Sequence, residues 1–148
     1  MSSLDDLYRE IILDHYRTPR NRGELEPPAV RVEGFNPLCG DEIVVYLDVR
    51  DGVVTEIKLT GQGCSISQAS SSLMSAAVKG KSVDDARNVI ATFKDLMTGP
   101  SDVAPTPSDL RRLGELAALA GVVKFPVRIK CATLAWNTLS QALDEATN

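Results

Sequence analysis

The sequence is poor in the residues that usually hold metal ions, with one histidine and three cysteines among 148 residues. The acidic N-terminus from Met1 to Asp6 lacks the basic flank and apolar segment of a signal peptide, and an odd number of cysteines without such a signal argues against a disulfide framework. These absences are typical of a cytoplasmic protein, in which thiols stay reduced. We therefore expect a cytoplasmic chain whose cysteines serve metal or sulfur chemistry.

Two further absences narrow the range of partners. No apolar run is long enough to span a bilayer, so we expect no membrane partner. The net charge of −4 lacks the basic excess that general nucleic-acid binding requires, so we expect no nucleic-acid partner. A chain of 148 residues that is 43% hydrophobic and 24% charged is ordinary for one globular domain, which we place at residues 1–148.

The first half of the chain predicts one helix followed by a small antiparallel sheet. Apolar residues at helical spacing cover about the first sixteen residues, and a helix there must end before Pro19. A short strand is expected at 30–32. Alternating β-branched residues predict strands over 42–50 and 53–60, joined by an Asp-Gly pair that favours a type I′ hairpin turn.

The second half predicts four helices, which makes the fold class α+β, with a small antiparallel β-sheet packed against helices. Small residues favour a tightly packed helix over 65–78, and a second helix is expected from Ser82 to about residue 98. A third is expected to open at Pro107 and close at Gly121, and a last one to run from about Pro126. The third helix should direct four leucines inward: Leu110, Leu113, Leu116 and Leu119.

The stretch Asn36-Pro37-Leu38-Cys39-Gly40-Asp41 brings a thiol and a carboxylate two residues apart in a turn-forming sequence. In an extended or turn geometry, residues two apart can point the same way, so Cys39 and Asp41 can converge on one point. The apolar strand that follows can hold them rigidly. The alternative interpretation of this stretch is a plain turn with a buried free cysteine.

The other two cysteines each have a physical reason to be anionic. Cys64 follows a Gly-x-Gly turn at a predicted helix N-terminus, where unpaired N–H groups and the helix dipole favour a thiolate. Cys131 lies near the start of the last helix beside the cations Arg128 and Lys130. Three thiolates and one carboxylate can make a four-coordinate site suited to zinc. Because the spacing matches no zinc-finger pattern, three ordinary half-buried cysteines remain an alternative on these residues alone.

Three nearby residues have less definite roles. We expect His15 to be a packing or surface residue rather than a ligand, because it lies on the N-terminal amphipathic helix. Lys130 either extends along the surface of its helix or gives electrostatic support to the sulfur site. Arg128 is a second candidate for that electrostatic support.

Four motifs resemble the IscU/SufU/NifU-N family of iron–sulfur cluster assembly proteins. The segment Asp14-His15-Tyr16-Arg17-Thr18-Pro19-Arg20-Asn21 is similar to the exit of that family's N-terminal helix. The three cysteine motifs are similar to Asn36-Pro37-Leu38-Cys39-Gly40-Asp41, Gly61-Gln62-Gly63-Cys64-Ser65-Ile66-Ser67 and Arg128-Ile129-Lys130-Cys131-Ala132-Thr133-Leu134-Ala135-Trp136. The resemblance covers nearly the whole chain. It implies the SufE/NifU-like α+β scaffold, with the metal ligands Cys39, Asp41, Cys64 and Cys131 at one exposed end.

Within that family the chain resembles the SufU branch. Lys130 precedes the third cysteine, where the IscU branch has a histidine, and the segment between Cys64 and Cys131 is long. A protonated lysine cannot coordinate zinc. The resemblance implies a bound Zn²⁺ and a SufS-type cysteine desulfurase as partner, with Cys39 as the catalytic residue that accepts persulfide sulfur.

Three functions stay open at this point. The resemblance favours a zinc-bound sulfur carrier, which would make the chain a zinc-dependent sulfurtransferase. The alternative is a scaffold that assembles a [2Fe-2S] or [4Fe-4S] cluster and transfers it to downstream assembly or carrier proteins. A structural zinc protein without sulfur transfer is the third reading, because closed four-ligand zinc sites are usually structural.

Overall fold

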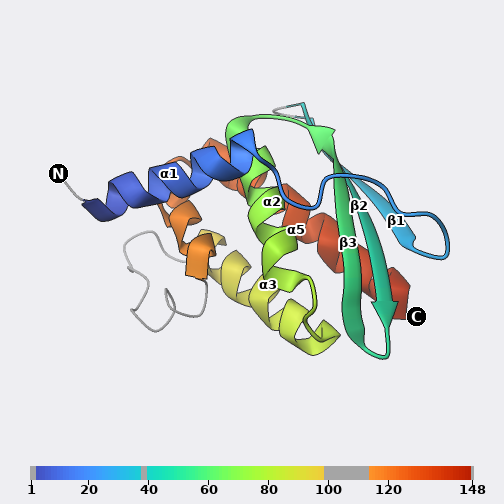
Figure 1. Cartoon of the computed structure of the whole chain (residues 1–148). Helices are drawn as coiled ribbons and strands as arrows, with labels where there is room; N and C mark the ends of the chain where they lie inside the picture. Colours follow the sequence, from blue (N-terminus) through green and yellow to red (C-terminus); the bar gives the residue numbers. More distant parts are fainter. Residues whose placement is uncertain (1–2, 38–39, 99–113, 148) are drawn as a thin grey trace.

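The computed structural model describes residues 3–37, 40–98 and 114–147 (Figure 1). The order of elements is a helix, a three-stranded antiparallel sheet and further helices, which confirms the predicted α+β class. Among the described residues, no helix combines the length and apolar character needed to cross a membrane. The elements are α1 Ser3–Arg17, β1 Val30–Asn36, β2 Asp41–Arg50, β3 Val53–Gln62, α2 Ser65–Val78, α3 Val83–Thr98, the 3₁₀ helix η1 Gly114–Lys124 and α5 Pro126–Thr147.

The sheet has the strand order β1-β2-β3, and its two ladders are antiparallel. The turn between β2 and β3 has positive φ at both Asp51 (54°) and Gly52 (73°), as a type I′ turn requires, so the predicted hairpin is confirmed. The register of the β2–β3 pairing shifts between Asp48 and Val49: Asp48 pairs with Glu56, and Val49 pairs with Val54. Before and after that shift, the same face of the sheet is buried through Ile43, Val45, Leu47, Val54, Ile57 and Leu59.

The helices form a layer against that face (Figure 1). Helix α5 packs across β1 and β2, α2 packs against β3 and α5, and α1, α3 and η1 pack around these two helices. At the centre, the rings of Phe93 and Trp136 stack with centroids 4.3 Å apart, and both side chains are fully buried. The sheet and the helices therefore share one core, which holds the ends of β2, α2 and α5 in fixed relative positions.

One predicted element differs from the structure. The expected α-helix from Pro107 to Gly121 is described only from Gly114 onward, where the chain forms η1, a 3₁₀ helix that continues past Gly121 to Lys124. The predicted leucines are spaced three residues apart, which matches the three-residue turn of a 3₁₀ helix better than the α-helical period. Leu116 and Leu119 are buried as predicted, whereas Pro107, Leu110 and Leu113 lie outside the described residues.

Helix α2 is joined to its neighbours by serine hydroxyls. Ser70 Oγ donates to the Ala132 carbonyl of α5 at 2.6 Å and accepts the indole N–H of Trp136 at 3.0 Å. On the other side, Ser72 Oγ accepts the backbone N–H of Arg20 at 2.8 Å and shares a 2.7 Å hydrogen bond with His15 Nδ1. These small, buried side chains allow close helix packing and satisfy polar groups that burial would otherwise leave unpaired.

Candidate metal centre

Three of the four predicted ligands lie together at one end of the molecule. Asp41 is the first residue of β2, Cys64 is the N-cap of α2, and Cys131 lies in the second turn of α5. The carboxylate oxygen and the two Sγ atoms are all within 4.8 Å of one another. Asp41 and Cys131 are buried and Cys64 is partly exposed. A carboxylate and two thiols from three separate elements therefore converge on one point.

Local hydrogen bonds fix Asp41 and Cys64 relative to each other. Asp41 Oδ1 accepts the backbone N–H of Cys64 at 2.9 Å, while Asp41 Oδ2 lies 4.0 Å from Cys64 Sγ. The Cys64 sulfur also accepts the backbone N–H of Ser67 at 3.4 Å, as an N-cap side chain does. One carboxylate oxygen is thus committed to the backbone, and the other faces the thiol.

The relative position of the two thiols depends on how α2 meets α5. The Ser70 hydroxyl donates to the carbonyl of Ala132, the residue that follows Cys131, and Ser70 lies six residues after Cys64. This bond is buried, so breaking it would leave a polar group without water or a partner. We did not expect this role from the sequence, where the serines of α2 indicated only small packing residues.

Arg128 faces both sulfur atoms. The negative charge of the Cys64 thiolate is the largest cause that raises the pKa of Arg128 above its usual range, and a hydrogen bond to Cys131 is the next. Its side chain is exposed, so the guanidinium contacts the thiols from the solvent side. Lys130, the other cation predicted to support the site, is also exposed. Cations beside cysteine thiols are typical of sites where cysteines bind metals or react as nucleophiles.

Two sequence-predicted residues do not belong to the described cluster. Cys39 lies outside the described residues; in the described segments on either side of it, Gly40 N donates a 2.8 Å hydrogen bond to Asn36 O. His15 is buried between α1, α2 and η1, where its Nε2 lies 3.6 Å from Glu115 Oε1. It is a packing residue, in agreement with the sequence analysis.

The donor set fits a four-coordinate zinc ion. With Zn–S bonds of about 2.3 Å and Zn–O bonds of about 2.1 Å, a tetrahedron separates its ligand atoms by about 3.5–3.8 Å. The observed separations are within 4.8 Å, and the one between Asp41 Oδ2 and Cys64 Sγ is 4.0 Å, so small side-chain rotations suffice. The same thiolates are also the usual ligands of iron–sulfur clusters.

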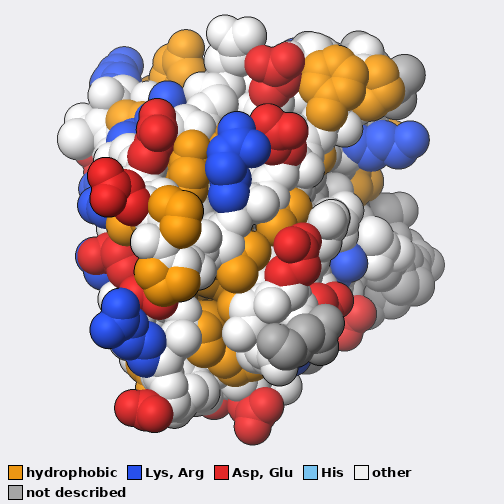
Figure 2. Space-filling model, turned by 90° about the vertical axis from the view of Figure 1, so that its right-hand side faces the viewer, with side chains coloured by type: hydrophobic (Ala, Val, Ile, Leu, Met, Phe, Trp, Pro, Cys, Tyr) orange, Lys and Arg blue, Asp and Glu red, His pale blue; other side chains and the backbone are white. Residues whose placement is uncertain are grey.

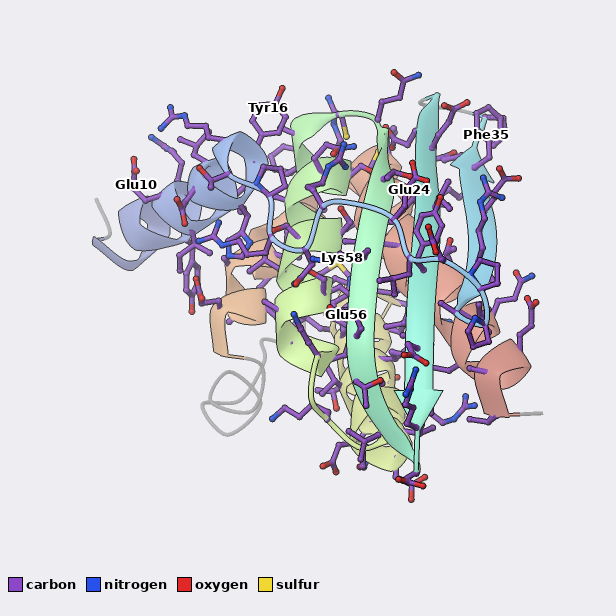
Figure 3. All side chains as sticks on the ribbon, turned by 45° about the vertical axis from the view of Figure 1, so that its right-hand side comes forward. Glu10, Tyr16, Glu24, Phe35, Glu56 and Lys58 are labelled. Atoms are coloured by element: carbon purple, nitrogen blue, oxygen red, sulfur yellow. The ribbon has the colours of Figure 1, made fainter. Side chains whose placement is uncertain are left out.

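Large hydrophobic side chains are exposed near the residues of the site, on β1 and at the start of α5. Phe35 is 58% exposed and lies next to Asn36, the residue of β1 paired with Asp41. Phe125 (62%) and Val127 (70%) flank the start of α5, and Val127 is one helical turn before Cys131. Figure 3 shows Tyr16 and Phe35 at the same end of the molecule. We call Phe35, Phe125 and Val127 the apolar rim.

The apolar rim is one of several hydrophobic areas on the surface. Figure 2 shows hydrophobic side chains along the upper edge of one face and in a broken band lower down, interleaved with charged residues. Scattered apolar residues are normal on a protein surface, whereas exposed aromatic residues beside a reactive site are typical of a surface that meets another protein.

Comparison with known proteins identifies the family that has this fold and this cluster of ligands. The chain belongs to the NifU-like N terminal domain family, whose model matches residues 7–132. It is 44% identical over 142 residues to the zinc-dependent sulfurtransferase SufU of Bacillus subtilis (strain 168), which covers 96% of this chain and 92% of that protein. The family resemblance predicted from the motifs is confirmed.

Other relatives carry a different name. The chain is 40% identical over 148 residues to the iron–sulfur cluster assembly scaffold protein IscU of Streptococcus pyogenes serotype M1, covering all of this chain and 89% of that protein. Among solved structures, a scaffold protein of the SUF system from Fervidobacterium islandicum AW-1 superposes with a TM-score of 0.81 at 30% identity, over 90% of this chain and 94% of that one. The family therefore includes iron–sulfur cluster assembly proteins with this fold.

Proposed function

We propose that the chain is a zinc-bound sulfur carrier in iron–sulfur cluster assembly, which accepts persulfide sulfur from a SufS-type cysteine desulfurase. The observation that carries this proposal is the convergence of the Asp41 carboxylate and the Cys64 and Cys131 thiols within 4.8 Å. The relative named as a zinc-dependent sulfurtransferase supports it. We further propose that residues 1–148 act as one domain in the cytoplasm.

Four residues would hold the ion: Cys39, Asp41, Cys64 and Cys131. Three of them are described and already lie close together, and Cys39 precedes Asp41 by two residues. A bound zinc ion keeps its thiol ligands deprotonated and ties the ends of three elements together. The exposed guanidinium of Arg128 adds a positive charge on the solvent side of the thiols, where an incoming anionic persulfide would approach.

We assign the transfer step to Cys39. Its thiolate attacks the terminal sulfur of the persulfide on the desulfurase, a new S–S bond forms on Cys39, and the S–S bond of the donor breaks. The donor cysteine leaves as a thiolate, so no external oxidant or reductant is needed. Cys39 lies two residues after Pro37 and directly before Gly40, whereas Cys64 is held as the N-cap of α2 and Cys131 lies within α5.

The surroundings of the site suit a protein partner that presents a persulfide. The apolar rim offers exposed hydrophobic area at the end of the molecule that carries the thiols, and Arg128 and Lys130 are exposed near the start of α5. Interfaces of this kind combine aromatic anchors with charged residues at their edge. We therefore propose that the desulfurase docks over the apolar rim.

A scaffold that builds a [2Fe-2S] or [4Fe-4S] cluster and passes it to downstream carriers is the second candidate. It is favoured by the same thiolate ligands and by the relative named as an iron–sulfur cluster assembly scaffold protein. Purified protein separates the two candidates: a carrier is colourless with one zinc per chain, whereas a scaffold that retains its cluster is brown.

The test is to mix the full chain with a SufS-type desulfurase and cysteine, alkylate the thiols and map the products by mass spectrometry. The proposal predicts one additional sulfur on Cys39 in the wild-type chain. Cys39→Ser should carry no persulfide and should not stimulate the desulfurase. A persulfide on Cys64 or Cys131 with Cys39 unmodified would contradict the assignment, and cluster assembly without any sulfur transfer would favour the scaffold.

A further inference from the structure

Gly63 lies directly against the Asp41 carboxylate. A Cβ atom at Gly63 would be 2.9 Å from Asp41 Cγ and 3.1 Å from Asp41 Cβ, and it would collide with Asp41 Oδ1. All three of the nearest atoms belong to this one side chain. Cβ contacts below 3.0 Å are essentially never seen in proteins, so any larger residue at position 63 must displace the carboxylate.

The backbone gives no other reason for a glycine at this position. The positive-φ glycines include Gly61, at 135°, whereas Gly63 does not have a positive φ and alanine would adopt its backbone conformation without strain. Gly61 is also required by its close approach to the main chain of Glu42. Because Gly63 has no side chain, the Asp41 carboxylate has room to occupy its position.

Asp41 has little room to move away. Its side chain is fully buried, its Oδ1 is bonded to the backbone N–H of Cys64, and its Oδ2 faces Cys64 Sγ at 4.0 Å. A methyl group at Gly63 would strike the oxygen that makes the backbone bond. The carboxylate would then rotate, lose the Cys64 N–H and move Oδ2 away from the thiols.

We infer that Gly63 is a positioning residue of the metal centre, which acts by letting the Asp41 carboxylate bridge the Cys64 backbone and the ligand site. This inference rests on the proposed function, because it takes Asp41 as a metal ligand. It assigns to Gly63 control of how firmly the oxygen ligand is held, and hence of how readily the metal exchanges. Residues that orient metal ligands typically change metal affinity by about 10–100-fold when mutated.

The test compares Gly63→Ala with Gly121→Ala in the full chain. Gly121 is exposed, and a Cβ there would meet nothing within 4 Å. Gly121→Ala therefore adds the same methyl group as Gly63→Ala without touching a neighbouring side chain. Two quantities are measured: the rate of zinc release to a chelator, and the hydrogen-exchange protection of the Cys64 amide by NMR in zinc-depleted protein. Both substitutions are also made on the Asp41→Ala background.

Gly63→Ala should release zinc at least about tenfold faster than wild type and lose protection at the Cys64 amide relative to amides in the core of α2. Gly121→Ala should change neither. On the Asp41→Ala background, Gly63→Ala should add less than a twofold change, because the carboxylate through which it acts is gone. Equal zinc release in Gly63→Ala and wild type, or equal acceleration on both backgrounds, would overturn the inference.

These readouts separate this inference from the proposed function. If the wild-type chain held no zinc, the proposed function would fail, and the Cys64 amide would still decide whether Gly63 positions Asp41. Loss of protection spread evenly over all amides would indicate general destabilisation and would count against a positioning role. Loss confined to the Cys64 amide supports it.

Discussion

The indole N–H of Trp136 donates to the hydroxyl of Ser70 at 3.0 Å, and this bond joins the two helices that carry Cys64 and Cys131. The same hydroxyl donates to the carbonyl of Ala132, next to Cys131 in the chain. Ser70, Trp136 and Ala132 are all buried, so water cannot replace either hydrogen bond if it is lost. The spacing of the two thiols thus depends on a hydrogen bond within the core as well as on hydrophobic packing.

Ser70→Ala should lower the free energy of unfolding by about 1–3 kcal/mol, because it leaves the Trp136 N–H and the Ala132 carbonyl buried without this partner. Urea denaturation monitored by tryptophan fluorescence measures the change. Ser65→Ala, an exposed substitution at the start of the same helix, should stay within about 0.5 kcal/mol of wild type. Equal stability of the two variants would show that the buried bond contributes nothing.

Two substitutions at Cys64 separate its capping role from its role as a ligand. Cys64→Ser keeps an acceptor for the Ser67 N–H, whereas Cys64→Ala removes it and should cost about 1 kcal/mol of additional stability in zinc-free protein. Both should lose zinc affinity, because both lack the thiolate. Elemental analysis after dialysis and thermal unfolding provide the two readouts. Full zinc occupancy in Cys64→Ser would exclude Cys64 as a ligand.

Stability should decrease in mild acid because of His15. Burial is the largest cause that lowers the pKa of His15 below the ordinary histidine value of 6.5, and the charge of Arg20 lowers it further, against the opposing effects of Glu115 and Asp14. Below pH 6.5 the unfolded chain therefore binds a proton that the folded chain does not. The free energy of unfolding must fall as the pH drops from 6.5 to the lowered pKa, by at most about 1.4 kcal/mol per pH unit from this residue.

His15→Asn tests this pH dependence, because an asparagine can keep the hydrogen bond to Ser72 and cannot titrate. Denaturation curves at pH 7.5 and 5.5, with metal content matched, should show a smaller loss of stability in the variant than in the wild type. The same loss in both proteins would mean that His15 is not the group responsible.

The apolar rim should contribute to desulfurase binding and not to zinc binding. Val127→Thr replaces a methyl group by a hydroxyl of similar size and should weaken binding about fivefold, and Phe35→Ser should weaken it by at least about tenfold. Val53→Thr makes the same exchange at the hairpin end, beside Gly52, and should have no effect. Titration calorimetry measures the affinities. If Phe35→Ser keeps its zinc and binds the desulfurase with unchanged affinity, the desulfurase does not dock on the apolar rim.

Most of the fold could be predicted because its signals are local. The Asp51-Gly52 turn, the alternation of the two strands and the small residues of 65–78 each indicate their structure within a few residues, and helix α2 has the predicted bounds Ser65–Val78. The error at Gly121 arose because four leucines at a spacing of three were assigned to an α-helix, although that spacing suits the 3₁₀ helix that forms. Periodicity over a short segment distinguishes these two helices poorly.

The site could be predicted only in part. Cys64 at a helix N-terminus and the cations near Cys131 are local features, and the family resemblance joined them with Asp41. The hydrogen bonds between elements that hold the ligands were not predictable, because they join residues far apart in the sequence: 23 positions for Asp41 and Cys64, and 62 for Ser70 and Ala132. The fit of Gly63 against Asp41 likewise depends on how β2 and the end of β3 meet, which no local pattern specifies.

X-ray absorption at the zinc edge of the full chain tests the central claim most directly, because it counts the atoms bound to the ion. The proposed ligands Cys39, Asp41, Cys64 and Cys131 predict one zinc per chain, with three sulfur atoms at about 2.3 Å and one oxygen at about 2.0–2.2 Å. In Asp41→Asn the three sulfur atoms should remain while zinc release becomes faster. A shell made only of nitrogen and oxygen, or protein that binds no zinc, would contradict the account.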